Sequence, residues 1–513
     1  MYLAQKEWFL STYPSISSSW VLDLLQFAET LGEPCLALLE GNEKDAQRTY
    51  LAFGKGWVLT PSSASSAISP PQDPLEHLRS FIKEHHPGLE CHSGIIGYLD
   101  YEWGLYWENP HSLETTPNYF FRLSPINLVL LPEEKKVILE VLTTDKSTLK
   151  KTFTHWKKGI EEFLNSYTFP SDSSISGYTT AHFKPSSFSN VSTLSTPPTS
   201  STLSIPSIPS NSSTTPAHSI SSNHPIPSTP GSPPNVRNLE LGPWLSNFSH
   251  GDFLKQVERI QERIRKSDIT QGVLSQRFTL KKKVQPWPIY QKLRLLNPSP
   301  WLFCVFGEGE TLVGSSPELL VSTVGSHVQT RPIAGTRPRG STDEEDQNLV
   351  QDLLQDKKER AEHTMLVELG QDEIRRVSTK GSVIVKDNFK VERFSHVMHI
   401  VSTVEGKLDP TYESLDALKT LFPAGTLTGS PKIKAMEILQ DCEPTPRGPY
   451  GGALGIYRWN GDLDFCITIR TLIIKENEVS VQSGAGIVED SIPEKEYQET
   501  LHKAQALFRA IEE

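Results

Sequence analysis

The chain has 513 residues, with 50 Lys and Arg against 61 Asp and Glu and a formal net charge of −11. This length allows two or more domains around a large core, and the mild acidic balance without a basic stripe argues against a general nucleic-acid binder. No apolar run is long enough to span a bilayer, and the first residues lack a basic segment followed by an apolar one, so we expect a soluble, cytoplasmic protein.

Residues 1–167 form an N-terminal segment in which short apolar runs alternate with turn signals. Runs of this length that are alternating or continuously apolar are typical of half-buried and buried strands. The expected strands are Cys35–Glu40, Tyr50–Phe53, Gly94–Leu99, Ile126–Leu131 and Lys136–Leu142, and helices are expected near Ser18–Leu31 and Thr148–Phe163.

The composition changes abruptly over residues 168–242, which are rich in Ser, Thr, Pro and Asn. Between Ser171 and Asn235, the only Asp, Glu, Lys or Arg residues are Asp172 and Lys184. Such a segment cannot bury enough apolar surface to offset the entropy lost on ordering. We therefore expect a disordered linker between two folded segments.

Residues 243–513 form the second segment, which is denser in motifs. Ser249 predicts a helix start, and an apolar stripe follows it at Leu254, Val257, Ile260 and Ile264. Further along, the pattern predicts a strand at Val273–Leu280, a helix from Asp343 to Leu369, and a last helix that begins after Ser491.

The pattern Glu-x-x-Glu occurs twice within these expected helices, at Glu359/Glu362 and at Glu496/Glu499. Residues three apart share one helix face, so each pair points in one direction. Four carboxylates at one place would repel unless a hard cation lay between them, and Mg²⁺ prefers such oxygen ligands. The alternative is two solvated helix faces. Lys503, one turn after Glu499, favours a site that binds a carboxylated substrate.

Three glycine-containing loops and two single residues are further candidates. The loops are 332–340, 425–432 and 484–486, and the second precedes an expected helix at Ile433–Leu439, where backbone N–H groups favour an anion. Glu318 begins an apolar strand and is either a general acid with a raised pKa or an ordinary strand-end residue. His399 alternates with apolar residues and is either a core residue or a catalyst.

Together these blocks resemble the chorismate-utilising enzymes, above all component I of anthranilate synthase and component I of aminodeoxychorismate (para-aminobenzoate) synthase. The resemblance is strong over residues 243–513 and weak before them. It rests on PIAGTRPRG (332–340), KERAEHTMLVELG (358–370), SHVMHIVS (395–402), GTLTGSPK (425–432), RGPYGGALG (447–455), CITIRT (466–471) and GAGIVEDSIPEKEYQET (484–500).

The resemblance implies an α+β fold with large antiparallel sheets wrapped by helices, in which the N-terminal segment packs on the catalytic domain. It also implies a Mg²⁺ site on Glu362 and Glu499, with Glu359 and Glu496 in support. The family pattern makes Glu318 the general acid that assists loss of the C4 hydroxyl of chorismate. The other implied positions are His399 beside the reacting ring, Thr426 in the substrate loop, and Tyr450, Arg470, Gly484, Gly486 and Lys503 around the substrate carboxylates.

Two positions are implied to select the reaction. Water-using relatives, the isochorismate and salicylate synthases, carry a lysine base where this chain has Gln271, so the resemblance favours ammonia as nucleophile. Aminodeoxychorismate synthases commonly carry a nucleophilic lysine where this chain has Ala334, so it favours anthranilate as product. The core without the linker is nevertheless closer in size to aminodeoxychorismate synthases, and that product remains the alternative. The glutamates, Arg470 and Lys503 argue against an inactive scaffold subunit.

The five cysteines are Cys35, Cys91, Cys304, Cys442 and Cys466. They contain no Cys-x-x-Cys pair and fit a reducing cytosol without a zinc site. None lies in a Gly-x-Cys-x-Gly elbow, so the chain shows no glutamine-hydrolysing half. We therefore expect ammonia to come from a separate glutamine amidotransferase subunit, component II, or from free ammonium.

Overall fold

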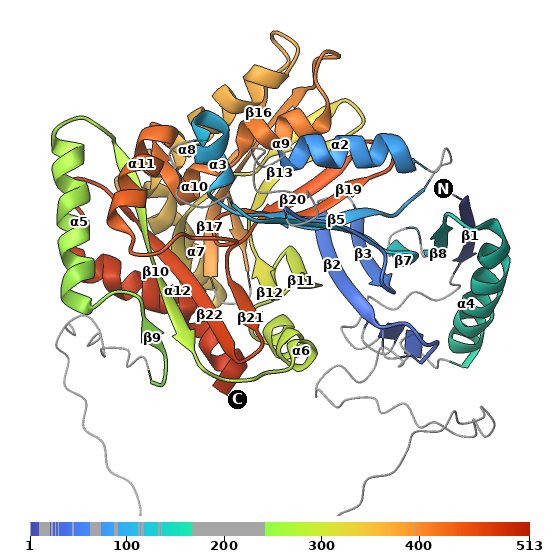
Figure 1. Cartoon of the computed structure of the whole chain (residues 1–513). Coiled ribbons are helices and arrows are strands. Elements are labelled where there is room, and N and C mark those ends of the chain that lie inside the picture. The colour runs from blue at the N-terminus through green and yellow to red at the C-terminus, as the bar shows by residue number, and fades with distance from the viewer. Residues whose placement is uncertain are drawn as a thin grey trace, which may run out of the picture. The chain divides into compact units, whose positions relative to one another are not determined.

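Two large sheets form the centre of the computed structural model (Figure 1). Every described strand pairing in them is antiparallel, and helices pack on the sheets, which confirms the expected α+β class. The structure describes residues 2–9, 21, 24–25, 27–28, 30–43, 46–61, 73–86, 91–110, 113, 117–131, 134, 136–166, 242–394 and 397–512. The expected linker, apart from Gly242, and half of the residues of the expected helix Ser18–Leu31 lie outside these residues.

The first sheet has twelve described strands. In spatial order they are β1 (Tyr2–Phe9), β8 (Lys136–Thr143), β7 (Ile126–Leu131), β3 (Ala46–Phe53), β2 (Cys35–Glu43), β11 (Trp301–Phe306), β12 (Thr311–Ser316), β21 (Thr471–Lys475), β22 (Glu478–Ile487), β10 (Gln271–Leu280) and β18 (Gly429–Ser430), with β9 (Leu245–Ser246) also paired to β10.

The second sheet has ten described strands. Their order is β15 (Ile333–Pro338), β17 (Val397–Lys407), β14 (His327–Thr330), β13 (Leu319–Val324), β20 (Leu463–Ile467), β19 (Ala453–Arg458), β5 (Gly94–Leu99), β6 (Tyr119–Leu123) and β4 (Trp57–Leu59), with β16 (Ile384–Arg393) also paired to β17.

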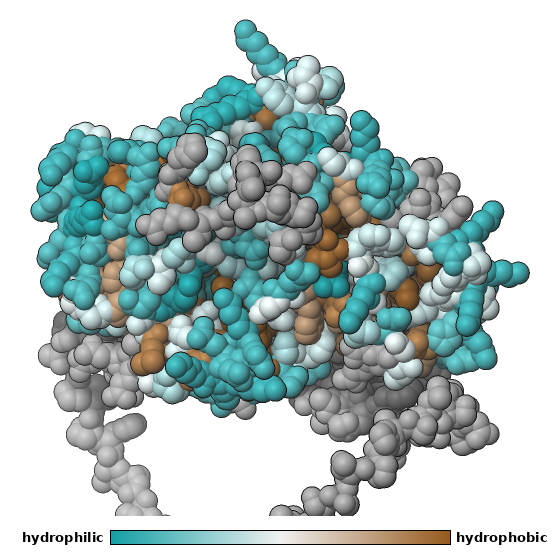
Figure 2. Space-filling model, viewed as in Figure 1, coloured by the Kyte–Doolittle hydropathy of each residue, from teal (hydrophilic) through white to brown (hydrophobic). Residues whose placement is uncertain are grey.

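The described helices are α2 (Pro74–His85), α3 (Trp103–Glu108), α4 (Lys146–Ser166), α5 (His250–Arg265), α6 (Pro286–Leu296), α7 (Asp343–Gln355), α8 (Lys357–Val377), α9 (Ser414–Leu421), α10 (Gly425–Thr428), α11 (Lys432–Cys442) and α12 (Pro493–Glu512). Within the described residues, no helix is both long and apolar enough to cross a membrane. On the face shown in Figure 2, hydrophilic residues make up most of the surface.

The segments before and after the linker contribute strands to the same sheets. β2 pairs with β11, for example Leu38 with Cys304, and β5 pairs with β19, for example Ile96 with Ile456. A buried cluster joins the two sheets through residues of both segments, among them Leu39, Ile96 and Phe303. Since both sheets contain strands from both segments, residues 243–513 pack directly against the N-terminal segment.

The single helix expected from Asp343 to Leu369 is wrong, because the chain forms α7 and α8 with a break between them. Asp356 leaves the helical conformation at ψ 114°, and its carboxylate accepts hydrogen bonds from the backbone N–H groups of Lys358 and Glu359. An aspartate at this position satisfies N–H donors that a helix start leaves open. The break therefore places Glu359 in the first turn of a new helix. By contrast, Ser249 caps α5 as expected.

Candidate active site

Glu318 lies in the short connection between β12 and β13. Its side chain is buried, and its backbone carbonyl accepts a hydrogen bond from Ile467 N at 3.0 Å, which fixes the connection against β20. Burial raises the pKa of Glu318 to about 8, although the nearby Thr426 hydroxyl and the cations Lys503 and Arg470 oppose that rise. The carboxyl is thus protonated at neutral pH and can donate a proton.

His399 lies on β17 opposite Thr336 of β15. Its Nδ1 is 2.9 Å from Gly335 O and 3.2 Å from Thr336 Oγ1. Since the carbonyl can only accept, the proton belongs on Nδ1, and Nε2 of the neutral ring is free to act as an acceptor. Burial lowers the pKa of His399 to about 4, so the ring is neutral at physiological pH.

The position of the Gly335 carbonyl, which contacts His399, depends on an irregularity in β15. The register shifts between Ala334, which pairs with Ile400, and Thr336, so Gly335 is an extra residue in the strand. Gly335 has a φ of +70°, a conformation that favours glycine. The bulge carries the carbonyl that orients His399, and Ala334 is buried immediately before it.

Glu362 of the first pair of glutamates lies at the end of β22, whereas Glu359 lies against Gly335 of β15. Gln271 Nε2 of β10 donates to Glu362 Oε1 at 3.2 Å. A Cβ on Gly486 would lie 2.7 Å from Gln271 Nε2 and 3.7 Å from Glu362 Oε1, so the absence of a side chain there leaves room for this contact. The structure therefore brings together three predicted site residues from β10, β22 and α8.

Glu499 of the second pair is linked to the same strand by a lysine. Lys503 Nζ lies 2.6 Å from Glu499 Oε1 and donates to Gly484 O at 2.9 Å. Burial acts to raise the pKa of Glu499, but Lys503 outweighs it and the pKa of Glu499 lies below its usual value. Glu499 is therefore an ionised carboxylate next to the backbone of Gly484.

The starts of α8 and α12 lie close enough to interact electrostatically. The charge of Lys358 on α8 acts to lower the pKa of both Glu496 and Glu499 on α12. Burial is the largest cause that raises the pKa of Glu359, and repulsion from Glu362 is the second. Burial likewise raises the pKa of Glu496 most, and repulsion from Glu499 adds to the rise. Carboxylates that repel one another have the donor chemistry that suits a hard divalent cation. In the described part of the chain, however, no three acidic, His or Cys groups lie close enough to hold a metal ion. The Mg²⁺ site stays a prediction.

Arg470 lies in the tight connection between β20 and β21 with a φ of +50°, and its carbonyl accepts a hydrogen bond from Ser315 N at 3.1 Å. Burial lowers the pKa of its guanidinium, against the opposing influence of Tyr450, Glu499 and Glu318. Among the described residues, none accepts a hydrogen bond from that guanidinium. A half-buried cation without a fixed partner among the described residues is suited to bind an anionic ligand.

Tyr450 is an electrostatic neighbour of Arg470. It is buried, and a Cβ on Gly484 would lie 3.0 Å from its hydroxyl, so the ring approaches the β22 backbone closely. Burial raises the pKa of Tyr450, which keeps its hydroxyl protonated as a hydrogen-bond donor. Tyr450 and Lys503 thus place two donors beside the Gly484 backbone, and Arg470 acts electrostatically on Tyr450.

The sequence alone indicated no role for Arg447, whose side chain stabilises the segments around Tyr450. Its side chain is 2% exposed and forms an ion pair with Glu443 at 2.6 Å. It also donates to Leu427 O and Val273 O, both at 2.6 Å, and its guanidinium lies 5.8 Å from the centre of the Tyr450 ring. The spacing of Glu443 and Arg447 would have suggested a pair, but not its burial. Arg447 joins α10, β10 and the Tyr450 loop.

We expect Arg447→Met to lower the free energy of unfolding by about 3–5 kcal/mol, because Glu443 would remain as an unpaired buried charge. Urea unfolding followed by fluorescence would measure the loss. Arg375→Met is the matched control, since Arg375 is 58% exposed and pairs with Asp372 on the surface. Equal stability of the two variants would contradict this role for Arg447.

A sequence model of the chorismate binding enzymes matches residues 37–509. The chain belongs to this family. Among curated relatives, anthranilate synthase component 1 of Acetivibrio thermocellus is 51% identical over 279 residues, covering 54% of this chain and 56% of that protein. The Bacillus pumilus protein of the same name is 51% identical over 267 residues, covering 52% of each chain. The chain thus spans about half the length of the curated relatives it matches.

Solved structures share the fold over almost the whole chain. Anthranilate synthase component I from Streptococcus pneumoniae superposes with a TM-score of 0.64 at 29% identity, covering 92% of this chain and 91% of that chain. The menaquinone-specific isochorismate synthase of Escherichia coli superposes with a TM-score of 0.65 at 17% identity, covering 99% and 95%. The second likeness concerns the fold alone.

Proposed function

We propose that this protein aminates chorismate with ammonia and releases anthranilate and pyruvate. The observation that carries the proposal is the buried, protonated Glu318 next to Arg470 and Lys503. An acid and two cations in one site match a substrate that has two carboxylates and loses a hydroxyl group. The names of the relatives, anthranilate synthase component 1, support the same reaction.

In this proposal Arg470, Tyr450 and Lys503 hold the substrate carboxylates together with the backbone of Gly484 and Gly486. Glu318 donates its proton to the C4 hydroxyl, which leaves as water while ammonia bonds to C2. The new ammonium group then loses a proton to solvent. Gln271 is a neutral amide and cannot act as a base toward water, which supports ammonia as the nucleophile.

The second half of the reaction expels the enolpyruvyl group as pyruvate and forms the aromatic ring. The neutral His399, with an unprotonated Nε2, is suited to accept a proton from the ring. We propose that Glu362 and Glu499 hold Mg²⁺, with Glu359 and Glu496 in support. When bound, the metal would neutralise the charge of a substrate carboxylate. Ammonia would come from a partner, a glutamine amidotransferase called component II, or from free ammonium.

The experiment that tests this function is a product assay with the purified full chain, chorismate, Mg²⁺ and ammonium at alkaline pH. We expect the blue fluorescence of anthranilate. A lack of anthranilate, with para-aminobenzoate formed once an aminodeoxychorismate lyase is added, would replace the proposal by the alternative, aminodeoxychorismate synthesis. Ala334, which lacks the amine of a lysine, favours the first outcome.

We expect the rate, corrected for the concentration of free ammonia, to fall at alkaline pH. Activity requires the acid form of Glu318, whose pKa is raised to about 8, so this form dominates below that pH and is lost above it. Free ammonia increases over the same range, so rates must be divided by its concentration. The corrected rate should be level below pH 8 and fall about tenfold per pH unit above it. A corrected rate that stays level well above pH 8 would contradict the role of Glu318.

A further inference from the structure

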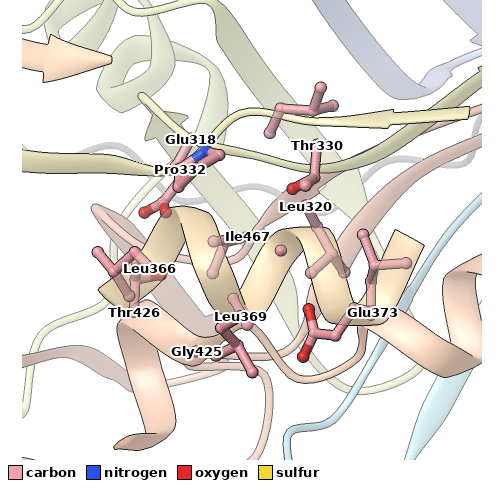
Figure 3. Close-up of a pocket in the computed structure, with 14 residues that line it drawn as sticks. Glu318, Leu320, Thr330, Pro332, Leu366, Leu369, Glu373, Gly425, Thr426 and Ile467 are labelled. Atoms are coloured by element: carbon pink, nitrogen blue, oxygen red, sulfur yellow. The ribbon is translucent and has the colours of Figure 1, made fainter. Parts of the chain in front are cut away.

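Thr426 lies on α10, and its hydroxyl hydrogen-bonds the buried Glu318 carboxyl. Both residues line one cavity, together with Glu373 of α8 (Figure 3). Apart from Glu318, no described residue hydrogen-bonds the Thr426 hydroxyl. This contact stabilises the ionised form of Glu318 and opposes the effect of burial on its pKa. The position of Thr426 therefore affects how readily Glu318 gives up its proton.

Neighbouring groups hold α10 in place, because a helix of one turn is not stable by itself. A Cβ on Gly425 would lie 2.2 Å from Leu369 Cδ2, so Gly425 packs directly on α8, as Figure 3 shows. On the other side of Thr426, Arg447 donates to Leu427 O at 2.6 Å. Thr426 thus lies between two residues that are each held by a neighbouring side chain.

Lys432 holds both ends of the longer segment that contains α10. It is the first residue of α11, and its Nζ donates to the carbonyl of Leu421, the last residue of α9, at 3.1 Å. The same Nζ forms an ion pair with Glu373 of α8. Residues 422–431, which include Thr426, therefore begin and end at one lysine that is anchored to α8.

Local chemistry does not explain the presence of Lys432. A lysine at the first position of a helix is electrostatically unfavourable, because the free N–H groups give that end a positive partial charge. The Lys432 side chain is only 12% exposed and that of Glu373 is 8% exposed, so both charges have lost most of their contact with water. Replacement of a buried ion pair by apolar side chains is often neutral or stabilising. A fixed arrangement of α8, α9 and α11 explains the pair better than stability does.

The other charges near the two carboxyls come from different elements. On Glu373 they are Arg376 and Asp372. On Glu318 they are Lys503 and Arg470. Removal of Glu373 and Lys432 together leaves the net charge unchanged, so a changed pKa of Glu318 would report on the position of Thr426.

We propose that the Glu373–Lys432 ion pair is a positioning pair that holds Thr426 against Glu318. In the function proposed above, on which this proposal rests, Glu318 protonates the departing hydroxyl. The pair fixes the two ends of residues 422–431, so the Thr426 hydroxyl stays in contact with the carboxyl. Glu318 then keeps the orientation from which it donates its proton.

The test removes the pair without changing the net charge. The double variant Glu373→Met/Lys432→Met should be about as stable as the unmodified chain. Its kcat with chorismate, Mg²⁺ and ammonium should fall about 10-fold to 100-fold, while KM changes by no more than a fewfold, because Glu318 loses its geometry. Lys434→Met is the matched control, since Lys434 lies on the same helix, is 46% exposed and pairs with Glu437. It should behave like the unmodified chain.

The pKa of Glu318 is a readout that a loss of stability alone would not move. Infrared difference spectroscopy, with the carboxyl band assigned through Glu318→Gln, titrates Glu318 without turnover. Loss of the Thr426 hydrogen bond should raise this pKa from about 8 by about one unit, in the double variant and in Thr426→Val alike. Thr426→Ser, which keeps a hydroxyl, should leave the pKa close to its original value.

A triple variant shows whether the pair acts through Thr426. When Thr426→Val is added to the double variant, we expect no further rise in the pKa of Glu318 and no further loss of kcat. A full additional effect of Thr426→Val would overturn the inference. An unchanged kcat and an unchanged pKa in the folded double variant would also overturn it. If the Met variant does not fold, Glu373→Leu/Lys432→Met removes the same pair, and the same results decide.

These outcomes separate the positioning pair from the proposed function. If the unmodified chain forms anthranilate and the double variant does so equally well, the pair has no positioning role and the proposed function survives. If the unmodified chain forms no aminated product, the proposed function fails. The titration of Glu318 then still decides whether the pair holds Thr426 in place, because it does not require turnover.

Discussion

Glu318→Gln should lower kcat by about 10²–10⁴-fold while leaving the KM for chorismate within a fewfold of its original value. The amide keeps the size of the carboxyl but cannot donate a proton to the C4 hydroxyl. It is also compatible with the site, because the Glu318 carboxyl is already neutral at pH 7. Steady-state kinetics at saturating ammonium would measure both constants.

Glu368→Gln is the matched control, since Glu368 is an exposed residue on the outer side of α8. It should behave like the unmodified chain. The alkaline limb that begins near pH 8 should also disappear from the residual activity of Glu318→Gln. Turnover of Glu318→Gln within tenfold of the unmodified chain, with the limb retained, would transfer the acid role to another residue.

Glu499→Gln should abolish turnover and weaken Mg²⁺ binding by at least about 100-fold. The change removes an ionised carboxylate and leaves Lys503 with the carbonyl of Gly484 as its one partner among the described residues. Calorimetric titration of the substrate-free chain with Mg²⁺ would measure binding without reference to activity. Circular dichroism would show that the fold is intact.

Glu494→Gln provides the comparison within the same helix. Glu494 lies in the first turn of α12 and contacts Gln498 and His250 instead of the site. Its substitution should leave both Mg²⁺ binding and turnover unchanged. If Glu499→Gln binds Mg²⁺ as tightly as Glu494→Gln does, Glu499 is not a ligand of the metal.

Local pattern predicted a part of the individual elements of the fold. The strand Gly94–Leu99 and the Ser249 cap follow from residues that are adjacent in sequence. The break at Asp356 escaped prediction because no Pro or Gly marks it, and the residue that ends one helix starts the next. The pairing of Leu38 with Cys304 could not be read from pattern either, since registers between distant strands depend on tertiary packing.

The residues of the candidate site could also be predicted only in part from the sequence. Glu318 and the two Glu-x-x-Glu pairs were visible as motifs, and the structure places all of them around β22, β13 and the starts of α8 and α12. The contact of Gln271 with Glu362 and the ion pair of Glu443 with Arg447 were not visible as such. Each depends on burial, which gives ordinary polar residues the geometry and the pKa that the chemistry uses.

The central claim is that this chain joins ammonia to chorismate and then releases pyruvate. The most direct measurement follows the purified chain with chorismate, Mg²⁺ and ¹⁵N-labelled ammonium by NMR and mass spectrometry. The account predicts one labelled anthranilate and one pyruvate for each chorismate consumed. Labelled aminodeoxychorismate without pyruvate, or isochorismate without label, would contradict it.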